Sequence, residues 1–307
     1  MNVVALAGGV GGAKLAHGLS LVLPPESLTV VVNTGDDFEH LGFHISPDVD
    51  TVMYTLAGLA NAETGWGMAG ETWSFLDALG RLGGETWFRL GDRDLATHVE
   101  RRRRLADGQT LTQVTQSLCG ALGVRPAVLP MSDDRLRTVV QTDEGELGFQ
   151  EYFVHRQCRP RVSGFIFEGA DQARPTAQVT RALTAADLIV FCPSNPFVSL
   201  GPILGLPGIQ DLVRARPALA VSPIVAGQAL KGPAGKMLAE LGLDVSAAAV
   251  AGYYTGLLRD FVLDALDAAQ AATLRAQGLR VLVTDTIMRS EADRARLAQQ
   301  ALDFAML

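Results

Sequence analysis

Cysteine is scarce in this sequence, and the few present are poorly placed for cross-linking. The 307 residues include three cysteines, Cys119, Cys158 and Cys192, which are odd in number and far apart. Such a set fits neither a disulfide framework nor a zinc site, so it indicates a reducing compartment. The five histidines also lack the spacing of metal ligands.

Long apolar runs and an excess of positive charge are missing as well. No stretch reaches the ~18 to 20 apolar residues that a membrane-spanning helix needs, and the run Val3 to Ala7 is too short for the apolar region of a signal peptide. Lysine and arginine number 26 against 33 acidic residues, and the net charge of −7 argues against a nucleic-acid partner. One basic run, Arg101 to Arg104, is typical of a solvated helix face. We therefore expect a soluble, cytoplasmic protein with neither a membrane nor a nucleic-acid partner.

The sequence does contain a regular alternation of short, β-branched runs with longer helical stretches. This pattern predicts parallel strands joined by right-handed crossovers. Because helices then cover both faces of the sheet, each strand reads as a continuous apolar run. The predicted strands are Val3 to Ala7, Leu28 to Val32, Pro126 to Pro130, Val162 to Phe167, Leu188 to Cys192, Ala218 to Val221 and Leu279 to Thr284. The expected fold class is α/β, with a Rossmann-like, doubly wound and mainly parallel sheet.

Two segments depart from that alternation. Between residues 61 and 123 the strand pattern gives way to helix formers broken by glycines, which indicates a helical insertion within a single domain of residues 1–307. Farther on, Arg137 to Thr142 and Phe149 to Val154 flank the turn-like Asp143 to Gly145. That arrangement predicts a hairpin at the edge of the sheet.

The first predicted strand runs directly into a glycine-rich segment, GGVGGAK at positions 8–14, which a helical pattern follows. A glycine turn at a helix N-terminus presents free backbone N–H groups and the positive end of the helix dipole, which together bind phosphate. Gly9, Gly11, Gly12 and Lys14 are therefore candidate substrate-binding residues. Their spacing matches neither the P-loop nor the dinucleotide fingerprint. A tight turn without a ligand is the alternative interpretation.

Polar and acidic residues follow the second predicted strand, where ligands collect in open α/β sheets. The segment there is NTGDD, at positions 33–37, and two more acids stand at the start of the next helical stretch. Carboxylates that converge on one cleft repel each other unless a cation lies between them, and Mg²⁺ with diphosphate oxygens is the usual solution. Helix capping is the alternative. The candidates are Asn33, Thr34, Asp36 and Asp37 for substrate, Asp36, Asp37 and Asp48 for metal, and Asp48 and Asp50 for catalysis.

Further candidates for substrate binding lie in three later polar segments. Arg89 stands among arginines and acids in WFRLGDRD, and arginine both binds phosphates in a bidentate manner and stacks on rings. A surface cluster of salt bridges is the alternative. Ser194 and Asn195 follow another predicted strand, and Lys231 lies in a glycine- and proline-rich turn after the next one. The ends of several strands therefore carry polar residues.

Six segments together resemble the 2-phospho-L-lactate transferase family of coenzyme F-420 biosynthesis. In chain order they are GGVGGAKL, NTGDDFEHLG, ISPDVDTVMYTLAG, WFRLGDRDLATH, CPSNPFVSLGPIL and SPIVAGQALKGPAGKM. The resemblance implies a transferase in which the terminal ribitol hydroxyl of the deazaflavin Fo attacks a phosphorus of a guanosine-diphosphate-linked carboxylic acid and releases GMP. It also implies Mg²⁺ as cofactor and a homodimer.

The same resemblance implies roles for individual residues. Asp50 and Arg89 would bind the deazaflavin, Asp48 would serve as metal ligand or base, and the glycine loop with Ser194 and Asn195 would hold the donor. The acid on the donor stays open between phospholactate, enolpyruvyl phosphate and phosphoglycerate.

Two other interpretations of the same motifs remain. The glycine loop and the NTGDD turn also resemble sugar-nucleotide-binding regulators of the gluconeogenesis-factor type, which are not enzymes. A glycine turn followed by Asp36 also imitates a nicotinamide-dependent dehydrogenase, although the third glycine of that fingerprint is missing.

Overall fold

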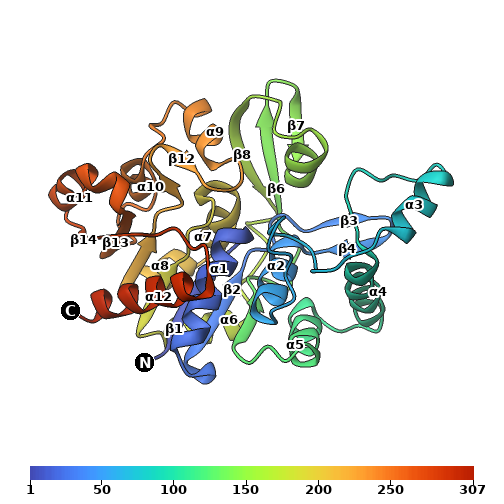
Figure 1. The fold of residues 1–307 in the computed structure, drawn as a ribbon, viewed down its shortest axis with the longest axis horizontal. Coiled ribbons are helices and arrows are strands. Elements are labelled where there is room, and N and C mark those ends of the chain that lie inside the picture. The colour runs from blue at the N-terminus through green and yellow to red at the C-terminus, as the bar shows by residue number, and fades with distance from the viewer.

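The computed structural model describes residues 1–307 and is built around one seven-stranded parallel sheet (Figure 1). Its strands lie in the order β14-β13-β10-β9-β1-β2-β5. The strand bounds are β1 (Val3–Ala7), β2 (Leu28–Val32), β5 (Ala127–Pro130), β9 (Leu188–Phe191), β10 (Ala218–Val221), β13 (Asp260–Asp264) and β14 (Arg280–Thr284). Strand order reverses between β1 and β9, which makes this the topological switch point of a Rossmann-like sheet. The predicted fold class is confirmed.

Helices cover both faces of the sheet. The bounds are α1 (Gly9–Val22), α2 (Pro47–Leu56), α3 (Ser74–Arg81), α4 (Asp92–Ala106), α5 (Leu111–Ala121), α6 (Ala177–Thr184), α7 (Gly201–Gly205), α8 (Ile209–Arg214), α9 (Ala234–Glu240), α10 (Ala247–Tyr253), α11 (Ala271–Ala276) and α12 (Glu291–Met306). Two π-helical turns occupy residues 151–155 and 196–200. None of the helices has both the length and the apolar character needed to cross a membrane.

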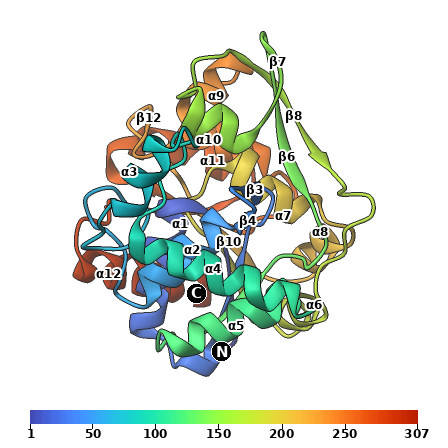
Figure 2. The same cartoon turned by 90° about the vertical axis from the view of Figure 1, so that its right-hand side faces the viewer.

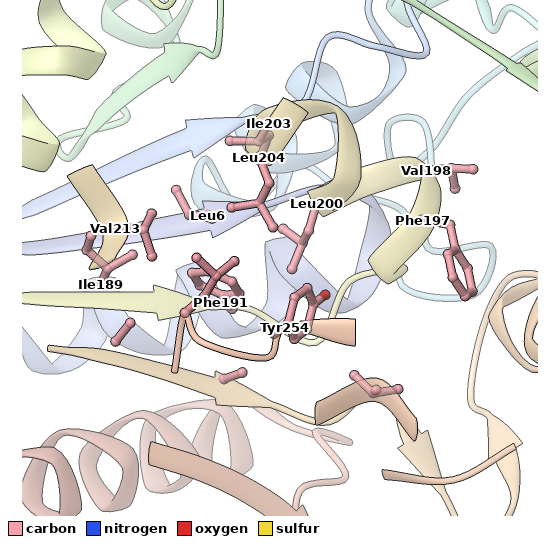
Figure 3. Packing of buried hydrophobic residues seen from close by; sticks show 14 of the residues in the cluster. Leu6, Ile189, Phe191, Phe197, Val198, Leu200, Ile203, Leu204, Val213 and Tyr254 are labelled. Carbon is pink, nitrogen blue, oxygen red and sulfur yellow. The ribbon is translucent and has the colours of Figure 1, made fainter. Parts of the chain in front are cut away.

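Two apolar cores lie on opposite faces of the sheet, because successive side chains of a strand point to opposite sides. On one face, Leu6, Ile189 and Phe191 pack among residues of α6, α7, α8 and α10 (Figure 3). On the other face, Ala5 and Val190 pack among residues of α1, α2 and α12. The central strands β1, β9 and β10 are therefore apolar at every position, as the sequence pattern predicts for a sheet covered on both sides.

Small antiparallel sheets surround the parallel one. Their strands are β3 (Phe38–His40), β4 (Phe43–Ile45), β6 (Arg137–Thr142), β7 (Gly145–Gly148), β8 (Val162–Glu168), β11 (Ile224–Val225) and β12 (Gln228–Ala229). β6, β7 and β8 form one three-stranded sheet, in the order β7-β6-β8, which projects from the body of the molecule (Figure 2).

Three predictions about strands need correction. The run Val162 to Phe167 is a strand, but it belongs to the antiparallel sheet, where Ser163 and Ile166 are exposed. The hairpin partner of β6 is β7, while residues 151–155 of the predicted partner form a π-helical turn. β13 was not predicted, because Asp260 and Asp264 bound its apolar centre and shorten the apolar run.

The segment from residue 61 to residue 123 holds α3, α4 and α5 and none of the named strands. Figure 1 shows these helices on the side of the molecule opposite α10 and α11. α5 begins with a capping box in which Thr110 and Gln113 exchange side-chain and backbone hydrogen bonds. The basic run in α4 is not uniformly solvated, because Arg101 is fully buried. This corrects the expectation for residues 101–104.

Candidate active site

The carboxyl ends of β1, β2 and β9 meet at the switch point of the sheet. β1 leads into Gly8, β2 into Asn33, and β9 into the turn at Ser194. The Ser194 hydroxyl accepts a hydrogen bond from the Gly8 N–H at 3.1 Å and donates one to the Gly8 carbonyl at 2.8 Å. This reciprocal pair ties two turns that are 186 residues apart in the sequence.

The glycines at the start of α1 are required by close packing. Gly9 has a positive φ of 61°, which side-chain-bearing residues rarely adopt. A Cβ on Gly11 would lie 2.2 Å from the carbonyl oxygen of Pro193, and one on Gly12 would lie 2.5 Å from the Ser194 hydroxyl. The glycine loop is therefore fitted against the turn after β9.

Gly11→Ala should destabilise the protein and reduce its activity, because the new methyl group must push α1 away from a rigid backbone carbonyl. We expect a loss of about 1–3 kcal/mol in unfolding free energy, measured by denaturant titration. Gly120→Ala is the matched control: Gly120 is helical, and a Cβ there meets nothing within 4 Å. That change should stabilise the protein by roughly 0.5–1 kcal/mol. Equal effects at the two positions would contradict the packing account.

The acidic centre of the site consists of Asp36 and Asp48, joined by Asn33. The Asn33 side-chain amide donates to Asp36 Oδ1 at 3.2 Å and to Asp48 Oδ2 at 2.9 Å. Asp48 also accepts from the Gly9 N–H at 2.6 Å, and Asp36 accepts from Gln150 Nε2 at 2.9 Å. The three central residues are buried, with exposed fractions of 0% for Asn33, 5% for Asp36 and 7% for Asp48.

Both carboxylates lack a cationic partner within the protein, and their proton affinities show it. Burial, reinforced by the negative charges of Asp48 and Asp37, raises the pKa of Asp36 well above its usual range. Burial raises the pKa of Asp48 to about 6, although hydrogen bonds from Asn33 and Gly9 oppose the shift. A divalent cation with hard oxygen ligands would remove this repulsion. Asp36 and Asp48 are therefore candidates to hold a divalent cation.

Asp37 points into different surroundings. Its carboxylate accepts from the Ser46 hydroxyl at 2.8 Å and lies 3.0 Å from His44 Nε2. Burial raises the pKa of Asp37, and His44 and Ser46 counteract that rise. With these partners Asp37 ties the β2 turn to the strand before α2. The structure does not bring it into the Asp36 and Asp48 pair.

Asp50 is buried in an ion-pair cluster with helix α4. Both of its oxygens are engaged by the Arg101 guanidinium, with Nη1 at 3.1 Å from Oδ2, and the Asp50 side chain is 7% exposed. His98 Nδ1 lies 3.1 Å from Arg101 Nη1, and Asp94 Oδ2 lies 3.4 Å from His98 Nε2. Asp50, Asp94 and His98 are close enough to hold a metal ion. The guanidinium already supplies the positive charge there.

Arg89 lies on the loop between α3 and α4. Its guanidinium carbon sits 4.1 Å from the centre of the Trp73 ring, a cation–π contact. Arg89 also lines an open cavity of about 450 Å³ together with residues of α3, among them Asp77 and Arg81. The side chain is exposed and thus free to meet a ligand.

Among the remaining candidates for substrate binding, one side chain caps a turn and the others have no acidic partner. The Asn195 side chain caps the turn after it, accepting from the Phe197 N–H at 3.0 Å. The Thr34 hydroxyl is buried without a hydrogen-bond partner. Lys14 donates to a backbone carbonyl at 3.1 Å and Lys231 to another at 3.2 Å, and neither pairs with an acid.

Gln150 and Arg101 contribute to the site and were missed from the sequence. Gln150 lies 114 residues from the carboxylate it contacts, and no motif surrounds it. Arg101 did carry a signal, since it belongs to the basic run, but it is the one member of that run whose side chain is turned fully inward. Helical spacing alone does not indicate which arginine faces a neighbouring helix.

Fold and site together define the class: a Rossmann-like α/β protein with a glycine turn and buried acids at its switch point. Comparison with known proteins names the family. A model of the family "2-phospho-L-lactate transferase CofD" matches residues 3–302. The chain belongs to this family, and it is therefore a transferase of coenzyme F-420 biosynthesis.

Curated relatives agree along nearly the whole chain. A phosphoenolpyruvate transferase of Streptomyces griseus is 42% identical over 99% of this chain and 98% of its own. A 2-phospho-L-lactate transferase of Methanosarcina mazei is 37% identical over 97% of this chain and 98% of its own. The crystal structure of a UPF0052 family member from Bacillus halodurans superposes with a TM-score of 0.64 over 98% of both chains, at 16% identity. That likeness supports the fold.

Proposed function

We propose that this transferase moves a phospho-carboxylic acid from a guanosine-diphosphate-linked donor to the deazaflavin Fo. The ribitol hydroxyl oxygen of Fo forms a bond to the phosphorus that carries the acid. The bond between that phosphorus and the bridging oxygen of the diphosphate breaks, GMP leaves with that oxygen, and the hydroxyl proton passes to a base. The observation that carries the proposal is the buried Asp36, Asn33 and Asp48 cluster beside the glycine turn.

Asp48 is the residue best placed to act on the acceptor hydroxyl. It stands at the start of α2, is held by Asn33 and the Gly9 N–H, and has a pKa raised to about 6. This pKa is that of the metal-free protein and a bound cation would lower it, so the position of Asp48 rather than its pKa makes it the candidate base. Asp48 thus orients the hydroxyl and takes its proton, while Lys14 and Lys231 supply positive charge toward the phosphates.

The proposal includes Mg²⁺, with Asp36 and Asp48 as the protein ligands. When bound, the ion supplies charge that neutralises the diphosphate oxygens. We expect transfer to stop when EDTA removes divalent cations and to resume when Mg²⁺ is added. Asp36→Asn should raise the Mg²⁺ concentration needed for half-maximal rate, which a metal titration measures. Full turnover in chelator would exclude the ion and leave lysine and arginine as the only neutralising groups.

The acceptor side of the proposal rests on Arg89. Its exposed guanidinium, on the Trp73 ring and facing the cavity beside α3, is suited to phosphate or to a flat aromatic ring. Asp50 contributes indirectly, because its carboxylate is already engaged by Arg101. It holds the start of α2, and with it Asp48, against α4, the helix that follows the loop carrying Arg89.

For the acid on the donor we propose enolpyruvyl phosphate. Relatives named phosphoenolpyruvate transferase reach 41–43% identity, whereas those named 2-phospho-L-lactate transferase reach 37–39%. The test is a set of parallel reactions with Fo, Mg²⁺ and each of the three guanylylated acids, followed by mass spectrometry. The enolpyruvyl donor should give the highest kcat/KM. A higher value for the phospholactyl or phosphoglyceryl donor would overturn this choice of acid.

A further inference from the structure

Gln150 is a buried polar side chain that reaches the acidic centre from a distant part of the chain. It follows β7, in the antiparallel sheet that projects from the body of the molecule (Figure 2). Its Nε2 donates to Asp36 Oδ2 at 2.9 Å, across 114 residues of sequence. Buried amides require hydrogen-bond partners, and Gln150 takes as its partner a carboxylate that is a candidate to hold a cation.

Asp36 receives one side-chain hydrogen bond on each of its two oxygens. Asn33 Nδ2 donates to Oδ1 at 3.2 Å, and Gln150 Nε2 donates to Oδ2 at 2.9 Å. The terminal torsion of an aspartate has only a broad intrinsic preference, so these two donors determine the plane of the carboxylate. Each carboxylate oxygen has about two acceptor sites, and each therefore keeps one for a cation.

Asn33 does not hold Asp36 alone, because its amide group is shared. The same Nδ2 also donates to Asp48 Oδ2 at 2.9 Å and to the Val198 carbonyl at 3.2 Å. An amide nitrogen carries two hydrogens, so three acceptors cannot each receive a full hydrogen bond. Gln150 Nε2, in contrast, has Asp36 as its only acceptor in the protein. The undivided hydrogen bond to Asp36 is therefore the one from Gln150.

The segment of residues 149–155 holds the Gln150 amide in place. The rings of Phe149 and Phe153 are stacked, with centres 5.4 Å apart and an angle of 6° between their planes. Phe149 and Tyr152 are both buried in the apolar core on one face of the parallel sheet. Gln150 therefore donates from a segment that is fixed by packing, as a group that orients a metal ligand must be.

The projecting sheet also contacts the residue before Asp36. The Thr138 N–H, in β6, donates to the Gly35 carbonyl at 2.5 Å. A Cβ on Gly35 would lie 2.9 Å from the Thr138 hydroxyl oxygen, so the two backbones are in close contact. One sheet thus fixes both the backbone that leads to Asp36 and the Asp36 side chain.

Partners that orient a metal ligand typically change metal affinity about 10- to 100-fold when they are removed. We propose that Gln150 is a positioning residue, which holds the Asp36 carboxylate in the orientation in which Asp36 and Asp48 receive a divalent cation. Gln150 acts through Asp36 and contributes no ligand of its own. The inference rests on the metal site of the proposed function, and it gives the sheet of β6, β7 and β8 a part in that site.

The test is titration of the full chain with Mn²⁺, a cation that suits carboxylate ligands, without nucleotide or Fo. Electron paramagnetic resonance measures the free ion. Gln150→Met keeps the length of the side chain and removes the donor, so it should weaken Mn²⁺ binding by about 10- to 100-fold. In transfer assays the same variant should need more Mg²⁺ for half-maximal rate and approach the native kcat at saturating Mg²⁺. A side chain that only stabilised the fold would lower the melting temperature without shifting the Mg²⁺ requirement.

Two control variants separate the amide from its surroundings. Gln141→Met is the same substitution in the same sheet, at a side chain whose amide faces Glu146 at 3.5 Å. Tyr152→Phe alters the segment that carries Gln150, because it removes the hydroxyl that Lys236 Nζ contacts at 3.3 Å. Both variants should bind Mn²⁺ with native affinity.

Native-like Mn²⁺ affinity in Gln150→Met would overturn the inference, and so would an equal loss in Tyr152→Phe. Should Gln150→Met fail to fold, Gln150→Asn decides the matter, because its amide is polar but one methylene too short to keep the bond to Asp36. A native protein that binds no Mn²⁺ would refute both the inference and the metal site of the proposed function. Weakened binding in a variant of a protein that never transfers to Fo would support the inference and refute the proposed function alone.

Discussion

Replacing Asp48 with asparagine should lower the rate of transfer by about 10² to 10⁴, the usual effect of losing a general base or a metal ligand. The amide keeps the shape of the side chain and removes both its charge and its capacity to accept a proton. Steady-state transfer at saturating donor and Fo measures the loss. A near-normal rate would remove Asp48 from the chemistry.

The same substitution should stabilise the metal-free protein at neutral pH. The pKa of Asp48 in the folded state, about 6, exceeds the unfolded value of about 4. The folded state therefore binds the proton more tightly, and its stability falls as pH rises from about 4 to about 6. Above that window the native protein carries the full cost of the buried charge. Asparagine removes that charge but gives up one of the hydrogen bonds that Asp48 accepts from Gly9 and Asn33, so the expected net gain in stability is small.

Thermal melts in EDTA at pH 5 and pH 7.5 test this second effect. The native protein should have a lower melting temperature at pH 7.5 than at pH 5. Asp48→Asn should reduce this difference in melting temperature without abolishing it, because the raised pKa of Asp36 also contributes to it. Asp264→Asn is the control for a buried acid at the same edge of the sheet. Its carboxylate accepts from the N–H groups of Leu266 and Thr286, so that variant should melt lower without losing transfer. A lower melting temperature for Asp48→Asn at pH 7.5 would contradict the account.

Removing the Arg101 guanidinium should cost about 3–5 kcal/mol of unfolding free energy, the largest stability effect we expect. Arg101→Met leaves the Asp50 carboxylate buried without its partner, in the middle of the contact between α2 and α4. Arg103→Met is the matched control on the same helix, because Arg103 forms exposed ion pairs with Glu100 and Asp107. That change should have almost no measurable effect on stability, because water and salt screen exposed ion pairs.

Denaturant titrations of both variants measure the difference. The double variant Asp50→Asn with Arg101→Met should recover part of the loss, because no buried charge remains unpaired. Equal stability of Arg101→Met and Arg103→Met would show that the buried pair contributes nothing. If Arg101→Met alone does not fold, the double variant still tests the account, because it should fold when the single variant does not.

Most of the parallel sheet could be predicted from the sequence, because burial on both faces makes such strands apolar at every position. The two errors in the strand prediction also arise from judging strands by their apolar runs. Val162 to Phe167 is as apolar as a central strand yet lies in a partly solvated antiparallel sheet. In β13, Asp260 is paired with Arg259 and Arg280, and Asp264 accepts hydrogen bonds from Leu266 and Thr286. Composition does not reveal a charge that is neutralised across the fold.

The residues of the site likewise include some that could be predicted from the sequence and some that could not. Asn33, Asp36 and Asp48 could be placed together because Asn33 and Asp36 follow a strand of the parallel sheet and Asp48 stands at the start of the next helix. The surroundings of Asp50 could not be predicted. From the sequence it stands at a helix start, where a polar change costs less than about 0.5 kcal/mol and Asp50→Asn would leave the fold intact. Its burial against Arg101, 51 residues away, reverses that expectation.

The most direct test of the proposed reaction is the identity and ratio of its two products. The native protein should be incubated with Fo, Mg²⁺ and the enolpyruvyl guanylyl donor, and the mixture followed by mass spectrometry within one turnover. We predict a deazaflavin that carries the phospho-acid and an equal amount of GMP. GMP without that deazaflavin, guanylylated Fo, or no reaction in a protein that binds UDP-sugars tightly would contradict the assignment.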